Sequence, residues 1–122
     1  MLYRTMVKRV QDYSGFADQE AETALRLVVE IIAERLEEGE RSDFANQLPI
    51  ELKMMVMSLR NRPQKLSTED VYDELMQLQD INRAHAKKQV MAVWQALEDA
   101  LSEGEIDNIR MQLPEEMAKE LH

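Results

Sequence analysis

Acidic side chains flank two glycines of this chain, and clustered carboxylates can bind hard cations such as Ca²⁺ or Mg²⁺. They form one group around Gly39 and another around Gly104: Glu37, Glu38, Glu40 and Asp43, then Glu103, Glu105 and Asp107. However, the D-x-D-x-D-G spacing of a calcium-binding loop is absent, and three unclustered glycines cannot form a phosphate-binding loop. We therefore favour a solvated acidic face and assign no metal ligand and no cofactor.

Side chains suited to nucleophilic or acid–base catalysis are few. The chain has no cysteine, no G-x-S-x-G motif and only two histidines, His85 and His122. His85 is expected near the start of a long helix, and we interpret it as an exposed polar residue. His122 is the last residue. These features predict a protein without enzymatic activity.

The composition limits the classes of partner. The 122 residues are 44% apolar and 32% charged, which predicts one globular domain with its own core. A net charge of −9 disfavours nucleic-acid binding, because an acidic surface repels phosphate. The sequence contains neither a signal-peptide-like run nor an apolar stretch long enough to cross a membrane. We therefore expect a cytoplasmic protein and leave open whether it binds a small molecule.

The triplet Gln-Leu-Pro occurs twice, beginning at Gln47 and at Gln112, so 65 residues separate the two copies. With this offset and no gap, ten of the 57 aligned pairs are identical, and the apolar pattern also matches. The sequence therefore predicts two internal repeats, residues 1–57 and 66–122, joined by a linker at 58–65.

The longest helix predicted in each half has an apolar stripe at helical spacing. The stripes contain Leu25, Val28, Val29, Ile32 and Leu36 in the first half, and Val90, Val93, Trp94, Leu97 and Leu101 in the second. We interpret both as core, including Trp94. Three shorter helices are predicted beside each long one. The predicted fold class is all-α, with eight helices in two tandem four-helix repeats packed as one bundle, a single domain of residues 1–122.

Glycine and proline suggest where these helices end. Gly39 and Gly104 follow the long helices, so we expect left-handed caps with positive φ there and N-caps at Ser42 and Asp107. Proline disfavours helix in the residue before it but suits the first position of a new helix, so QLP predicts a corner between two helices, with the proline as the first helical residue. The predicted structural joints are Gly39, Gly104, Gln47, Leu48, Pro49, Glu51, Gln112, Leu113, Pro114 and Glu116.

The segments "EGERSDFANQLPIEL" at 38–52 and "EGEIDNIRMQLPEEM" at 103–117 share this layout after a long helix. In this respect the chain resembles a bacterial family known as domain of unknown function 2267. The resemblance covers almost the whole sequence and implies a small all-helical bacterial protein. It implies no activity and no catalytic residue.

The helix that follows Pro49 is apolar on two faces, because Ile50, Met54 and Met57 form a second stripe at helical spacing. The residues 65 positions later are polar: Glu115, Lys119 and His122. The second stripe is either buried between the two halves, which we favour, or a surface for a homodimer or protein partner.

Two classes of function follow from these patterns. We favour a non-enzymatic helical scaffold or protein-interaction module that could also self-associate. The alternative is a regulator that binds a metal ion or small molecule between the two repeats.

Overall fold

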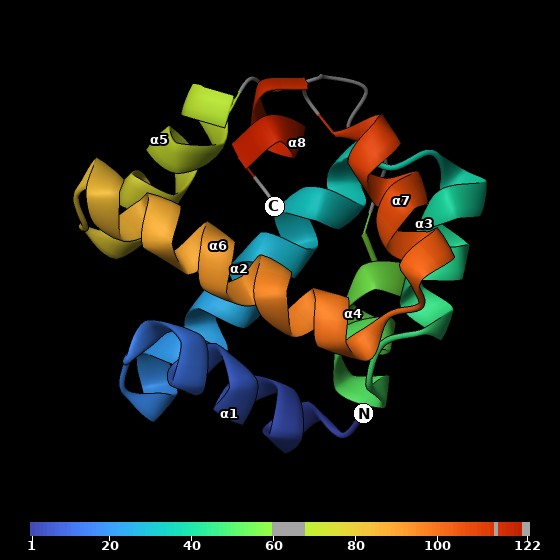
Figure 1. Ribbon diagram of the computed structural model, residues 1–122, viewed down its shortest axis with the longest axis horizontal. Coiled ribbons are helices and arrows are strands. Elements are labelled where there is room, and N and C mark those ends of the chain that lie inside the picture. The colour runs from blue at the N-terminus through green and yellow to red at the C-terminus, as the bar shows by residue number, and fades with distance from the viewer. Residues whose placement is uncertain (60–67, 114, 121–122) are drawn as a thin grey trace.

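Two crossing helices form the centre of the molecule in the computed structural model, which describes residues 1–59, 68–113 and 115–120. They are α2 (Asp18–Arg35) and α6 (Arg83–Ala100), each of 18 residues, and they pack against each other (Figure 1). Every residue of the two predicted apolar stripes is at most 7% exposed. The predicted core, with a fully buried Trp94, is therefore confirmed.

A shorter helix precedes each long one. α1 (Tyr3–Ser14) packs against both α2 and α6, whereas α5 (Thr68–Gln79) packs against α6. Both are followed by a left-handed residue, Gly15 with φ 77° and Asp80 with φ 54°. This backbone conformation lets the next N–H groups reach the free carbonyls of the last turn, and the N–H of Gly15 donates to Gln11 O at 2.7 Å.

The turns after the long helices differ from the prediction. A single extended residue, Leu36 after α2 and Leu101 after α6, redirects the chain. The extended backbone of Leu36 and Leu101 ends each long helix, so no left-handed residue is needed. Both leucine side chains are buried, at 2% and 7% exposure. Gly39 and Gly104 lie inside the next helices, and the positive φ predicted for both is wrong.

These next helices, α3 (Glu38–Asn46) and α7 (Glu103–Gln112), also begin earlier than predicted. Ser42 and Asp107 therefore lie within the helices and are not N-caps. The N-cap of α7 is Ser102, whose hydroxyl oxygen accepts a hydrogen bond from the N–H of Glu105 at 3.2 Å. Glu37 occupies the same position before α3, without a capping bond from its side chain.

The first QLP segment makes the predicted corner. α3 ends at Asn46, and α4 (Ile50–Met57) begins directly after Pro49. Pro49 is extended, with ψ 151°, and is thus the N-cap and not the first helical residue that we expected. In the second segment α7 ends at Gln112 and α8 (Glu115–Glu120) follows. Pro114 lies outside the described residues.

All the regular secondary structure of the described residues is helical, without strands, so the all-α class is confirmed. Seven of these helices have eight or more residues, whereas α8 has six, so the predicted number of eight is reached only by counting this short segment. The α8 sequence is largely polar and offers little apolar surface to bury. Most of the predicted linker at 58–65 lies outside the described residues. None of the described helices is long and apolar enough to cross a membrane.

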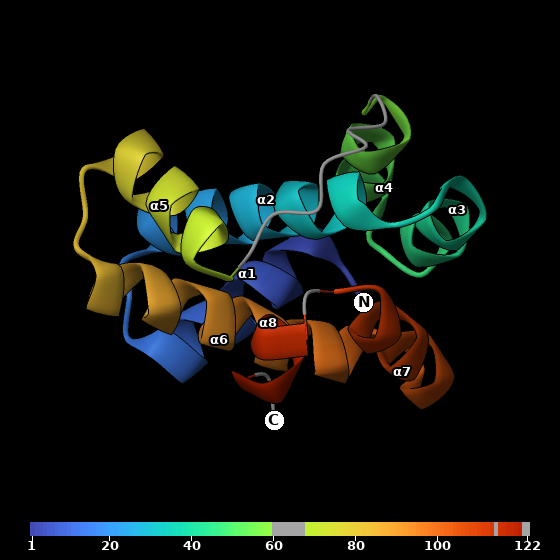
Figure 2. The same cartoon turned by 90° about the horizontal axis from the view of Figure 1, so that it is seen from above.

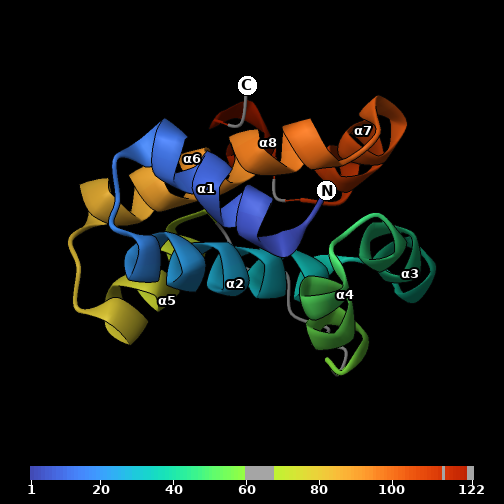
Figure 3. The same cartoon turned by 90° about the horizontal axis from the view of Figure 1, so that it is seen from below.

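The helices gather at two ends of an elongated molecule. α3 and α7 lie side by side at one end, with α4 next to α3, and α5 with the start of α6 forms the other (Figure 2). The N-terminal end of α1 approaches α4 (Figure 3).

Candidate functional site

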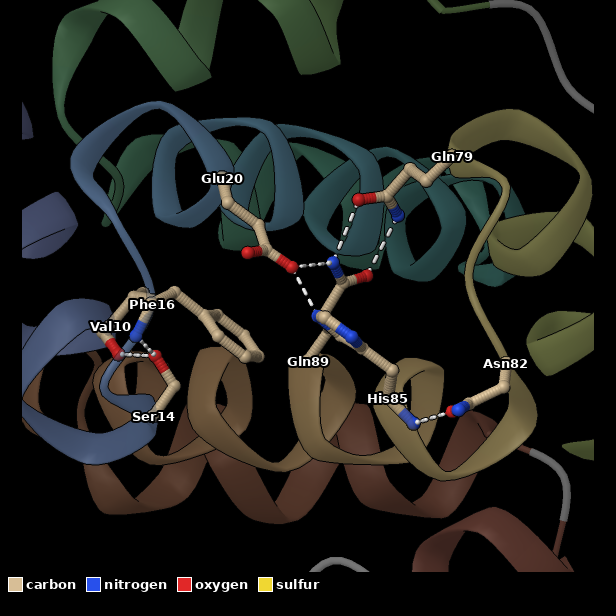
Figure 4. A network of polar contacts seen from close by, with 8 residues as sticks. All are labelled: Val10, Ser14, Phe16, Glu20, Gln79, Asn82, His85 and Gln89. Atoms are coloured by element: carbon tan, nitrogen blue, oxygen red, sulfur yellow. Dashed lines mark hydrogen bonds and ion pairs between the residues drawn. The ribbon is translucent and has the colours of Figure 1, made fainter.

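A polar network joins α2, α5 and α6 near the starts of the two long helices (Figure 4). Glu20 Oε1 contacts His85 Nε2, and Gln89 Nε2 donates to the same carboxylate oxygen at 3.4 Å. Gln89 is completely buried and exchanges two amide hydrogen bonds of 2.7 Å with Gln79 of α5. The network therefore satisfies a buried amide and connects three helices.

His85 is held by several contacts in addition to Glu20. Its ring stacks on Phe16 with ring centroids 5.1 Å apart, and Lys88 Nζ lies 5.7 Å from the centre of the Phe16 ring. Its backbone N–H donates to Asn82 Oδ1, the N-cap of α6, at 2.8 Å. Interpreting His85 as an exposed polar residue is thus wrong, because its half-buried side chain ties α6 to α2.

The hydroxyl of Ser14, drawn in Figure 4, is not arranged as a nucleophile for His85. It donates to the carbonyl of Val10 at 2.6 Å and accepts from the N–H of Phe16 at 3.1 Å. A catalytic serine instead donates its proton to the base that activates it. The contacts of His85 and Ser14 at this end of the molecule therefore support a structural role for both residues.

At the opposite end of the molecule, the glutamine of each QLP segment forms a hydrogen bond with the other half of the chain. Gln47 Oε1 accepts a hydrogen bond from the N–H of Ser102 at 2.8 Å, and Gln112 Oε1 accepts from the N–H of Glu37 at 2.9 Å. Ser102 and Glu37 are the N-cap residues of α7 and α3. Each glutamine therefore satisfies a free backbone donor at a helix start, as a capping box does within one helix.

Three carboxylates converge between α3 and α7: Glu40, Asp43 and Glu105. One oxygen of each lies within 4.8 Å of the other two. Glu40 and Asp43 are three residues apart on α3 and share one face of that helix. Glu105 is only 5% exposed, Glu40 is half-buried, and Asp43 is exposed. The cluster therefore has a buried centre and one side open to solvent.

Burial and like charges raise the pKa of Glu105 to about 7. Desolvation is the largest cause, followed by the hydrogen bond and repulsion from Glu40 and by repulsion from Asp43. When both glutamates are ionised, Glu40 Oε1 and Glu105 Oε1 are buried acceptors without a donor. This arrangement favours an added proton or a bound cation at the centre of the cluster.

The other acidic residues named from the sequence do not join the cluster. The side chains of four of them are exposed: Glu37, Glu38, Glu103 and Asp107. A solvated acidic face describes these four, whereas Glu105 departs from it.

The second apolar stripe of α4 is exposed. Ile50, Met54 and Met57 are 61%, 67% and 57% exposed, while Leu52 and Val56 on the opposite face are fully buried. Burial of the second stripe between the two halves, which we favoured, is therefore wrong for a single copy of the chain. The role of the three exposed side chains as an interaction surface stays a prediction.

Residues 3–120 match the family described as "Uncharacterized conserved protein (DUF2267)". The chain belongs to the DUF2267 family. No curated protein matches it. The resemblance inferred from the sequence is confirmed, and the description of the family specifies no activity.

Sequence reasoning on this DUF2267 chain missed four contacts between residues that are distant in sequence. They are the Glu20–His85 pair, the glutamine hydrogen bonds and the Glu40–Glu105 pair. One signal could have suggested two of them: Glu20 and His85, and likewise Glu40 and Glu105, are separated by the same 65 residues as the two QLP triplets.

Proposed function

We propose that this DUF2267 protein is a non-enzymatic helical interaction module that self-associates through the outer face of α4. The supporting observation is the exposure of Ile50, Met54 and Met57, each more than half exposed on a helix whose other face is buried. Exposed contiguous apolar side chains are uncommon on monomers, and methionine is frequent at adaptable contact surfaces.

The outer face of α4 is where a second copy of the chain meets the least electrostatic repulsion. The chain has a net charge of −9, so two copies repel each other over most of their surfaces. α4 has one acidic and one basic residue, Glu51 and Lys53, and is therefore neutral. Leu2, just before the start of α1, is 78% exposed, and α1 packs beside α4. Two copies can meet at this neutral apolar face with the least electrostatic cost.

Three side chains can form only the centre of an interface, because a stable one covers about 800 Å² on each partner. We therefore expect weak association that depends on concentration.

The double variant Met54→Glu/Met57→Glu tests this proposal by sedimentation velocity over a range of concentrations. We expect the wild type to shift from monomer to dimer as concentration rises, and the variant to remain a monomer with an unchanged thermal unfolding curve. Met111→Glu is the matched control, because Met111 is 82% exposed but lies on α7. The proposal fails if the wild type stays monomeric throughout, or if Met54→Glu/Met57→Glu still dimerises.

We further propose that residues 1–57 and 66–122 are structural repeats related by an approximate twofold axis. In support, the first residues of α5, α6, α7 and α8 each follow those of α1, α2, α3 and α4 by 65 positions. The two glutamine hydrogen bonds are related by the same offset. Superposing the two halves tests this directly, and poor overlap of α2 on α6 would contradict it.

The self-association surface would belong to the first repeat alone. The positions of Ile50 and Met54 are taken in α8 by Glu115 and Lys119, which form an ion pair at 3.4 Å. A polar counterpart in the second repeat limits association to one surface per chain, which favours dimers over longer assemblies.

A further inference from the structure

The cluster of Glu40, Asp43 and Glu105 contains two buried carboxylate oxygens that accept no hydrogen bond. Glu105 is only 5% exposed, and its Oε1 accepts no hydrogen bond. Glu40 Oε1 is likewise buried and without a donor. Desolvated carboxylates are costly unless a proton, a cationic side chain or a metal ion compensates them.

We infer that Glu40, Asp43 and Glu105 bind one divalent cation of about the size of Ca²⁺ between α3 and α7. This inference is independent of the proposed self-association, which concerns a different helix. Three oxygen donors of this kind are the ligands of hard cations, and the open side of the cluster leaves room for water ligands.

The all-carboxylate ligand set favours Ca²⁺ over Mg²⁺. Two ligands on opposite sides of one ion are separated by twice the metal–oxygen distance, which is roughly 4.6–5.2 Å for Ca²⁺ and roughly 4.0–4.2 Å for Mg²⁺. The three carboxylate oxygens lie within 4.8 Å of one another, a separation that a single Ca²⁺ ion can span. Mg²⁺ also retains its water more strongly, which disfavours a site of three protein carboxylates.

A cation at this position would join the two halves of the chain. Glu40 and Asp43 come from α3, and Glu105 comes from α7. In the same region, Gln47 and Gln112 each accept a hydrogen bond from a backbone N–H of the other half. Binding would remove the repulsion between Glu40 and Glu105, a repulsion that also contributes to the raised pKa of Glu105. The bound form should therefore be more stable than the free protein.

The test is thermal unfolding of the whole protein at pH 7.5 after removal of metal with EDTA and dialysis. Tm is compared in CaCl₂, in MgCl₂ and in NaCl of equal ionic strength. We expect CaCl₂ to raise Tm by roughly 3 °C or more, MgCl₂ to raise it less, and NaCl to have no comparable effect. Isothermal titration calorimetry should give one Ca²⁺ per chain.

Two variants connect the effect to the cluster. Glu105→Gln and Glu40→Gln should each lose at least tenfold in Ca²⁺ affinity, because each removes one charged ligand while keeping the side-chain shape. Glu103→Gln is the control: it removes the same charge from an exposed residue in the first turn of α7 and should bind Ca²⁺ as the wild type does. The inference is overturned if CaCl₂ stabilises no more than NaCl, or if both cluster variants retain wild-type affinity. An equal response to MgCl₂ would overturn the assignment to an ion of calcium size.

Discussion

Replacing Glu105 with glutamine is expected to stabilise the protein above pH 7 when divalent cations are chelated. The pKa of Glu105 is raised from 4.5 to about 7 by burial and by Glu40 and Asp43, so the folded state binds an additional proton between these two pH values. The stability that this proton contributes is present below pH 4.5 and is lost as the pH rises through about 7. Glutamine has nearly the same shape and no titration, so the variant should not lose this stability.

The size of the effect follows from the pKa values. Each unit of difference between the folded and unfolded pKa corresponds to 1.36 kcal/mol, so a pKa of about 7 in place of 4.5 corresponds to about 3 kcal/mol. For a chain of 122 residues this is a difference in Tm of roughly 10 °C. The measured quantity is the difference in unfolding free energy between variant and wild type, compared at pH 4.5 and at pH 8. Any effect of the substitution that does not depend on pH therefore cancels.

Urea unfolding followed by circular dichroism in EDTA measures this quantity at several pH values between 4.5 and 8. The stability of the wild type should fall relative to Glu105→Gln across this range. Glu103→Gln should follow the wild type within about 0.5 kcal/mol, because Glu103 is exposed. If the curves of Glu105→Gln and wild type stay parallel from pH 4.5 to pH 8, the argument that Glu105 is protonated in the folded cluster is refuted.

Three further predictions concern the backbone and the glutamine contacts. Gly39→Ala and Gly104→Ala should each stabilise by about 0.5–1 kcal/mol in urea unfolding, because both residues are helical and an added Cβ meets no atom within 4 Å; a lower urea midpoint would contradict this. Gly15→Ala should destabilise by about 1 kcal/mol because φ is 77° there, and an unchanged Tm would show that the strain is absent. Gln47→Ala and Gln112→Ala should each cost about 1 kcal/mol of unfolding free energy for a lost hydrogen bond. Costs near zero would mean that water replaces the amide oxygens.

Local patterns were sufficient for much of the fold. The stripes of α2 and α6 were predictable because a helix in a small domain must bury one face, and the apolar residues recur with its period. The corner before Pro49 was predictable because proline restricts the residue that precedes it. The turns at Gly39 and Gly104 were not, because one extended leucine redirects the chain as well as a left-handed glycine does.

The exposure of the second apolar stripe of α4 could not be predicted from the local sequence. The sequence indicates that Ile50, Met54 and Met57 share one face, since their spacing is helical. It does not indicate what lies opposite that face, which depends on where the other helices pack. In the structure α1, α2 and α3 pack against α4, and the three side chains remain exposed.

The amino-acid sequence by itself determined the all-helical class and the core stripes, because both follow from the spacing of apolar residues along one helix. Only the tertiary structure decided which acidic residues meet, because Glu40, Asp43 and Glu105 become neighbours through the packing of α3 against α7. The same packing sets the pKa of Glu105, since desolvation and repulsion depend on distances between side chains of different helices. The sequence shows that the carboxylates exist, and their chemistry depends on the contacts between the two halves.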